Sequence, residues 1–261
     1  MGAQASELSY AVRPWVLAVY IGQLCLVAAA LTLPPLLFAV FEADLGVCLR
    51  YAVVIAVFGA PVLFLKRFRE PKRIQTNEAM VIAAIIFALV PAATTWPLMG
   101  AGLSFTDALF EAVSGVTTTG LTTLDTVADK PAHFRFARSW MQWYGGLGFV
   151  VLSLALVVRA GSATKELSVV ESREEDLIGG TKTYARRVFR IYALMTLVAG
   201  IAIVLTGVSP FEGLLYALAA VSTGGFSPLD ESLAPLAGAV TPVVVLLACV
   251  AGAVPLAFYY Q

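Results

Sequence analysis

Two short segments rich in hydroxyl groups and glycine have the composition of a site that takes a cation out of water. A dehydrated cation needs oxygen ligands, and potassium filters supply them as backbone carbonyls from four loops around one axis. Glycine permits the positive φ angles that turn successive carbonyls toward an ion. The candidate cation-coordinating residues are Thr118, Thr119 and Gly120 in the first segment and Thr223, Gly224 and Gly225 in the second.

Both segments lie in an internal repeat whose two copies are 105 residues apart. Each copy follows one long apolar stretch and precedes another. A constant offset of this kind marks duplicated units. Identical residues in the two copies include Ser104 and Ser209, Thr118 and Thr223, Gly120 and Gly225, and Asp125 and Asp230.

Asp125 and Asp230 each follow a candidate filter glycine by five residues. At the outer mouth of a pore, such carboxylates would concentrate cations. An acidic side chain in an ordinary solvated loop has the same appearance in a sequence. Both interpretations of these two residues stay open.

The elements that must position these residues are membrane helices, because the composition is that of an integral membrane protein. Hydrophobic residues make up 59% of the chain and charged residues 13%, against about 25% charged in soluble domains. A helix needs roughly 20 apolar residues to cross a bilayer. Six membrane helices are predicted, over Pro14–Phe41, Tyr51–Leu65 extended back to Leu45, Ala79–Thr106, Ser139–Val158, Ile191–Phe211 and Ser232–Gln261.

Two further apolar runs, Ala112–Leu124 and Gly213–Leu229, are too short or too interrupted to span. Each is interpreted as the end of a half-helix, Asp107–Val116 or Glu212–Ala220, followed by a filter loop. Non-helical backbone at membrane depth is tolerated only where it is buried or lines a water-filled path. The predicted fold is therefore an all-α integral membrane protein. It has six transmembrane helices with two re-entrant pore half-helices and filter loops, arranged as potassium-channel-like repeats.

This interpretation divides the chain into four parts. They are an N-terminal transmembrane helix pair (1–73), a first helix–pore loop–helix repeat (74–160), a cytoplasmic connector (161–190) and a second repeat (191–261). Basic residues crowd 66–73 and 159–190, and the positive-inside bias places both segments in the cytoplasm. The N-terminus is then inside, and both filter loops enter from the outside.

Charge and the rarer residue types exclude other classes of function. The 17 basic and 17 acidic residues give no net charge that would recruit nucleic acid. Cys25, Cys48 and Cys249 lie in apolar runs, with neither the pattern of a disulfide framework nor metal-ligand spacing. The predicted spans hold no nucleophile with a positioned base, so neither enzyme activity nor a cofactor is expected. His133 is interpreted as a bystander in an outer loop.

Three linked segments carry a resemblance to a known family. They are Asp107–Gly120, Arg138–Gly148 (RSWMQWYGGLG) and Val221–Ser227 (VSTGGFS). On these segments the chain resembles the Trk/Ktr/HKT superfamily of potassium transporters, and within it the bacterial TrkH-type subunits. The resemblance implies a multi-pass protein of the bacterial cytoplasmic (inner) membrane, surrounded by lipid, with the potassium ion as its transported substrate. It also implies four repeats around one filter, preceded by an extra helix pair; this chain would supply that pair and two repeats.

Because two loops do not close a fourfold filter, the resemblance implies a partner. That partner is a second half of the transporter, or a second copy of the chain related by twofold symmetry. The end of the chain inside the apolar run Pro255–Gln261 is interpreted as a sign of a truncated or split product. Alternatives to potassium uptake are a non-conducting subunit that only assembles with a second half, and a sodium-permeable transporter. Passive conduction and coupling to H⁺ or Na⁺ both stay open.

The resemblance further implies a regulatory partner on the cytoplasmic side. In the resembled family, a cytosolic ring-forming, nucleotide-binding subunit of the TrkA or KtrA type regulates the pore. The connector 161–190, with Glu171–Asp176 at its centre, is the expected docking surface by analogy at the level of the fold. A solvated connector without a partner is the alternative interpretation.

Overall fold

The structure, a computed structural model, describes residues 11–65, 74–162, 174–236, 238–255 and 258–259. Among these residues every regular element is a helix, which confirms the all-helical prediction. In chain order the elements are α2 (Pro14–Phe41), α3 (Leu45–Leu65), α4 (Thr76–Leu98), η1 (Met99–Ala101), α5 (Phe105–Val116), α6 (Ala132–Ser162), α7 (Glu174–Leu205), α8 (Pro210–Val221) and α9 (Val240–Ala253).

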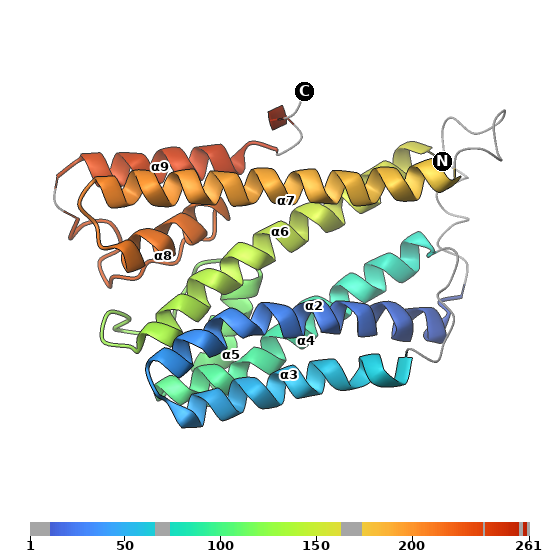
Figure 1. The fold of residues 1–261 in the computed structure, drawn as a ribbon, viewed down its shortest axis with the longest axis horizontal. Coiled ribbons are helices and arrows are strands. Elements are labelled where there is room, and N and C mark those ends of the chain that lie inside the picture. Colours follow the sequence, from blue (N-terminus) through green and yellow to red (C-terminus); the bar gives the residue numbers. More distant parts are fainter. Residues whose placement is uncertain (1–10, 66–73, 163–173, 237, 256–257, 260–261) are drawn as a thin grey trace. The chain divides into compact units, whose positions relative to one another are not determined.

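The chain forms two compact units. The first is built from residues up to 113 together with 131–136, and the second from 114–130 together with the chain from 137 onward. In the first unit α2 packs against both α3 and α4, and the three helices lie side by side (Figure 1). In the second unit α7 packs against α8 and α9 (Figure 1).

An ion pair joins the starts of α2 and α4 in the first unit. The carboxylate of Glu78 accepts hydrogen bonds from the backbone N–H of Arg13 at 3.1 Å and from its Nε and Nη2 at 2.7 and 2.9 Å. It also accepts the backbone N–H of Gln75 at 2.9 Å, which caps α4. The Glu78 side chain is fully buried, and four donors satisfy its charge there.

The turn between α2 and α3 reverses the chain over few residues. Ala43 has a φ angle of 56°, in the left-handed region. The side chain of Asp44 then accepts the backbone N–H of Val47 at 3.0 Å and caps α3. Beneath the turn, Ala39, Val47 and Tyr51 form a buried apolar cluster.

Several helix ends differ from the sequence prediction. The fourth helix, α6, begins at Ala132 rather than at Ser139, so His133 lies in its first turn and is 2% exposed instead of lying in an outer loop. The start is earlier because Pro131 leads into the helix and the carboxylate of Glu42 accepts the first backbone N–H groups. Much of the predicted connector is also helical, since α7 begins at Glu174; residues 163–173 of the connector lie outside the described residues.

The last helix, α9, is shorter than the predicted span Ser232–Gln261. Gly238, with a φ of 80°, precedes its start, and Val254 is extended at its end with φ −71° and ψ 130°. The residue before a proline is driven out of the helical region, and Pro255 follows here.

By length and composition, three segments of the described chain are able to cross a membrane: Pro14–Phe41, Asn77–Ala101 and Arg186–Leu205.

Candidate functional site

The two half-helices have the same length and equivalent ends. α5 and α8 each contain 12 residues, and their bounds are offset by the 105 residues of the sequence repeat. Each is capped by an equivalent serine. The hydroxyl of Ser104 accepts the backbone N–H of Asp107 at 3.2 Å, and that of Ser209 accepts the backbone N–H of Glu212 at 3.2 Å.

The two filter loops repeat each other's backbone conformation. Thr118 and Thr223 have φ angles of 55° and 53°, and Gly120 and Gly225 have φ angles of 77° and 84°. A β-branched residue with positive φ is a strained outlier, and such strain gathers at functional sites. Its recurrence at equivalent threonines indicates that both loops are held in one specific shape.

Hydrogen bonds to the end of each half-helix hold this shape. The N–H of Thr118 donates to the carbonyl of Gly115 at 3.0 Å, and that of Thr223 to the carbonyl of Ala220 at 2.9 Å. The next N–H groups bond in the same way. Thr119 donates to Ser114 at 2.9 Å and Gly224 to Ala219 at 2.8 Å. Because these N–H groups point back at the helix, they do not compete with an ion for the loop carbonyls.

The second unit brings both loops into contact through Gly120 and Gly224. A Cβ atom added at Gly120 would lie 2.1 Å from the carbonyl oxygen of Gly224, a distance that real Cβ atoms do not show. Gly224 is buried, whereas Thr119, Thr223 and Gly225 are exposed and Thr118 and Gly120 are half-buried. The structure therefore places the six predicted residues at the ends of α5 and α8, with the two loops in direct contact at Gly120.

The two predicted outer-mouth acids have different surroundings. Asp230 accepts the backbone N–H groups of Val127 and Ala128, the latter at 3.0 Å, and so ties the end of the second loop to the segment after the first. These two hydrogen bonds, aided by the charge of Arg138, hold the pKa of Asp230 below its usual range. Asp125 is exposed. Asp230 therefore keeps its negative charge at neutral pH beside the end of the second loop.

A glycine in the helix after each loop lies against the last residue of the half-helix. A Cβ at Gly145 of α6 would lie 2.1 Å from the carbonyl oxygen of Val116, and a Cβ at Gly252 of α9 would lie 2.3 Å from that of Val221. Val116 and Val221 are equivalent residues of the repeat. Close packing of helices through glycine therefore occurs in both repeats.

The donor atoms that the two loops offer are oxygens. No group of three His, Cys, Asp or Glu residues that would hold a metal ion occurs in the part of the chain that the structure describes. The ends of α5 and α8 carry the negative pole of each helix dipole, which favours a cation beside the loops. Threonine hydroxyls and loop carbonyls are the hard oxygen donors that such an ion accepts.

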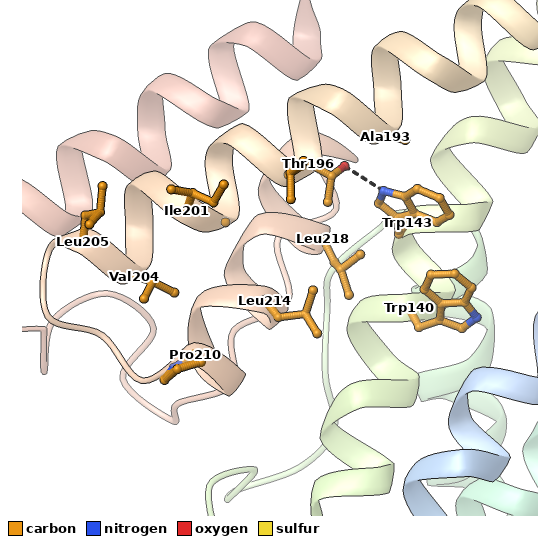
Figure 2. A pocket seen from close by; sticks show the side chains of 12 residues that line it. Trp140, Trp143, Ala193, Thr196, Ile201, Val204, Leu205, Pro210, Leu214 and Leu218 are labelled. Carbon is orange, nitrogen blue, oxygen red and sulfur yellow. Dashed lines mark hydrogen bonds between the residues drawn. The ribbon is translucent and has the colours of Figure 1, made fainter.

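An apolar groove of about 530 Å³ lies elsewhere in the second unit, among α6, α7 and α8 (Figure 2). Trp140 and Trp143 line one end, and the Nε1 of Trp143 donates to the hydroxyl of Thr196 at 2.9 Å (Figure 2). Leu197, Ile201, Val204, Leu214 and Leu218 make up much of its wall. A lining of this kind suits alkyl chains rather than an ion stripped of water.

Two residues near the loops are missed by the sequence analysis as members of the site. Gln142 and Arg138 of α6 are 0% and 2% exposed, and both hydrogen bond to the backbone of the second loop. The available signal was a polar pair spaced four residues apart at the start of a predicted apolar span, a place where a polar group needs a partner.

Comparison with known proteins agrees with this geometry. A family model described as a TrkH cation transport protein matches residues 46–259. The Trk system potassium uptake protein TrkH of Halomonas elongata is 30% identical over 222 residues, which are 82% of this chain and 46% of that protein. The Trk system potassium uptake protein TrkG of Escherichia coli is 29% identical over 210 residues, 77% of this chain and 43% of that protein.

The fold is also that of a solved transporter. The crystal structure of the potassium transporter TrkH from Vibrio parahaemolyticus matches with a TM-score of 0.75 at 22% identity, covering 91% of this chain and 49% of that chain. The chain thus spans about half the length of the relatives it matches. The chain has duplicated half-helices and loops, and it matches the family model over residues 46–259. It therefore belongs to the TrkH family of cation transport proteins.

Proposed function

We propose that this chain supplies two of the loops that line the potassium path of a Trk-type uptake system in a bacterial cytoplasmic membrane. Potassium ions would be coordinated by backbone carbonyls of Thr118, Thr119 and Gly120 and of Thr223, Gly224 and Gly225. Asp125 and Asp230 would raise the local concentration of cations at the outer mouth. Potassium is then the transported substrate.

The repeated loop conformation is the observation that carries this proposal. Two segments 105 residues apart adopt the same positive φ angles at an equivalent threonine and an equivalent glycine. Positive φ angles at these positions are the backbone geometry that can turn loop carbonyls toward an ion. The names of the relatives, which are potassium uptake proteins, favour potassium as the ion.

The membrane arrangement we propose has six spans and two re-entrant half-helices, with the N-terminus inside. The three long apolar segments support this arrangement, as do the shorter apolar helices Leu45–Pro61, Pro210–Val221 and Val240–Ala253. Short helices that end in a loop at membrane depth must be covered by other protein segments, because each unpaired backbone group there costs several kcal/mol. Lipid would surround the outer faces of the spans.

Four loops complete a potassium filter, so we propose that two loops of this chain act together with further loops. A second half of the transporter would supply them, or a second copy of this chain. On the cytoplasmic side, a ring-forming nucleotide-binding subunit would dock near the connector 161–190. Exposed Arg186, Arg187 and Arg190 on α7 offer a basic surface for it.

Substitution of the filter glycines tests the ion path. Gly120→Ser and Gly225→Ser should each lower the potassium over sodium permeability ratio of the assembled transporter by about tenfold, or 1.4 kcal/mol of differential binding. The first adds atoms where the carbonyl of Gly224 lies, and the second strains a left-handed residue. Gly148→Ser is the matched control, because a Cβ at Gly148 meets no atom within 4 Å.

Radiotracer flux or reversal potentials would measure the ratio. Unchanged ratios in both filter variants would remove these residues from the ion path. A sodium-preferring ratio before any substitution would favour the sodium-permeable alternative.

The non-conducting alternative needs its own test. In a bacterium that lacks potassium uptake, we expect no growth at low potassium with this chain alone, and growth when a polypeptide carrying two further repeats is supplied with it. Growth with this chain alone, from particles of two identical chains, would establish a filter of two copies. Failure in both arms would favour a subunit that assembles without conducting.

A further inference from the structure

The two filter loops share a backbone conformation but differ in what anchors them beyond the filter glycine. In the first repeat the hydroxyl of Ser114, on the half-helix itself, donates to the carbonyl of Leu121 at 2.6 Å. The residues equivalent to Ser114 and Leu121 in the second repeat are Ala219 and Phe226. Alanine has no hydroxyl, so the second loop needs an anchor from elsewhere.

Gln142 of α6 supplies that anchor. Its Nε2 donates to the carbonyl of Gly224 at 2.5 Å, and its Oε1 accepts the backbone N–H of Phe226 at 3.1 Å. The side chain is 0% exposed, so water does not replace either bond. A carbonyl only accepts and an N–H only donates, so a neutral amide is the side-chain group that satisfies both partners at once.

The anchor acts directly on the contact between the loops. A Cβ at Gly224 would lie 2.4 Å from Cδ of Gln142, and a Cβ at Gly120 would lie 2.1 Å from the carbonyl oxygen of Gly224. The peptide of Gly224 is therefore packed tightly between the side chain of Gln142 and the first loop. A shift of the Gln142 amide moves the carbonyl that lies against Gly120.

Arg138 extends the same anchor by one helical turn. Its Nη1 donates to the carbonyl of Ser227 at 3.3 Å, and its guanidinium lies 3.9 Å from the centre of the Phe226 ring. Residues four apart share one face of a helix. One face of α6, in the first repeat, thus holds the backbone of the second filter loop from Gly224 to Ser227.

We propose that Gln142 is a positioning residue for ion selectivity, which sets the carbonyl of Gly224 against the first loop and so fixes the width of the ion path on that side. Gln142 acts on the ion through the loop and does not coordinate it. The inference rests on the proposed function, because selectivity is the property it explains. It assigns to α6 of one repeat the control of the filter loop of the next.

Two near-isosteric variants separate this role from space filling. Gln142→Met keeps the length of the side chain and removes both hydrogen bonds, whereas Gln142→Glu keeps the acceptor for Phe226 and removes the donor for Gly224. In the assembled transporter we expect Gln142→Glu to lower the potassium over sodium permeability ratio by about tenfold, the effect of leaving one buried hydrogen-bonding group unpaired. Gln142→Met leaves two such groups unpaired and should lower the ratio by at least as much. Thr241→Val is the matched control, because it removes the 2.8 Å hydrogen bond from the buried Thr241 to the partly exposed Thr206, away from both loops.

Amide hydrogen exchange in lipid nanodiscs gives a second readout that does not depend on transport. In Gln142→Met the Phe226 amide loses its acceptor, so a peptide covering 222–230 should exchange about tenfold faster, while one covering 117–121 changes less. Faster exchange together with lower selectivity supports the inference.

The remaining outcomes overturn the inference and separate its failure from that of the proposed function. Unchanged exchange overturns the positioning role, and so does faster exchange with wild-type selectivity. In both cases Gly120→Ser still reports on the ion path. Equal loss of selectivity in Thr241→Val also overturns it. Wild-type selectivity in the Gln142 and both glycine variants overturns the proposed function as well.

Discussion

The imidazole of His133 is buried against the carboxylate of Glu42, with Nδ1 lying 2.6 Å from Oε2. The same carboxylate accepts the backbone N–H groups of Ala132 at 2.7 Å and of His133 at 2.8 Å. A side chain from the turn after α2 therefore caps the start of α6, although the two residues are 91 positions apart in the sequence. The negative charge of the capping acid also interacts favourably with the positive pole of that helix's dipole.

This cap predicts a loss of stability in acid. Burial raises the pKa of Glu42, but the hydrogen bonds from His133 and Ala132 outweigh burial and leave the pKa below its ordinary 4.5. A group with a lowered folded-state pKa contributes stability that is present above the unfolded value and lost as pH falls through the folded value. The unfolding temperature should therefore fall below about pH 4.5 in the wild type, and Glu42→Gln should flatten that decline.

Thermal unfolding in detergent between pH 7 and pH 3 would measure both curves. Asp129→Asn is the control, since Asp129 is 62% exposed and lies 3.9 Å from Lys130. A Glu42→Gln curve with the same acid decline as the wild type would contradict the capping role.

A second prediction concerns the Arg13–Glu78 pair. Glu78→Leu leaves the guanidinium and two backbone N–H groups without their acceptor, so we expect a loss of about 2 kcal/mol of stability, within the range for hydrogen bonds to charged groups. The partial exposure of Arg13 keeps the loss below that of a fully buried pair. Denaturant midpoints would show it. A loss no greater than that of Asp129→Asn would mean that water replaces the carboxylate at no cost.

A third prediction uses the glycines behind the half-helices. Gly145→Ala and Gly252→Ala each place a methyl group within about 2.3 Å of a backbone carbonyl oxygen, which forces the following helix away. Overpacking of this kind costs about 1–3 kcal/mol. Gly148→Ala on the same α6 should be neutral, because a Cβ there meets no atom within 4 Å. Three equal unfolding temperatures would show that the helices separate freely.

A fourth prediction concerns the direction from which the first filter loop enters the membrane. In a variant without Cys25, Cys48 and Cys249, a cysteine at Thr126 should react with a membrane-impermeant maleimide only from outside. A cysteine at Ser168, which lies outside the described residues, should react only from inside. Labelling of both sites from one side would rule out a re-entrant loop around Gly120.

Local signals in the sequence were enough to place the short helices and their loops. Two copies of the serine cap and of the Thr–Gly pattern reinforce each other, so the predicted half-helices Asp107–Val116 and Glu212–Ala220 differ by at most two residues per end from α5 and α8. A single copy would have resembled an ordinary turn. The role of these loops in ion coordination stays a prediction.

The burial of three polar residues of α6 was not predicted, because their partners are distant in the sequence. His133, Arg138 and Gln142 are polar residues at the beginning of an apolar run, and periodicity alone assigns such residues to a solvated end. All three are buried, and each forms a hydrogen bond with Glu42 or with the second filter loop from 82 to 91 residues away. Local pattern does not contain these pairings.

The different anchors of the two loops have a genetic consequence. In a channel made of identical subunits, one codon change alters every filter loop at the same time. Here Ser114 and Gln142 hold separately encoded loops, so a mutation at either position removes the anchor of one loop and leaves the anchor of the other intact. Under the proposed function, ion preference would be adjustable in small inherited steps, each of which begins at the anchor of one loop.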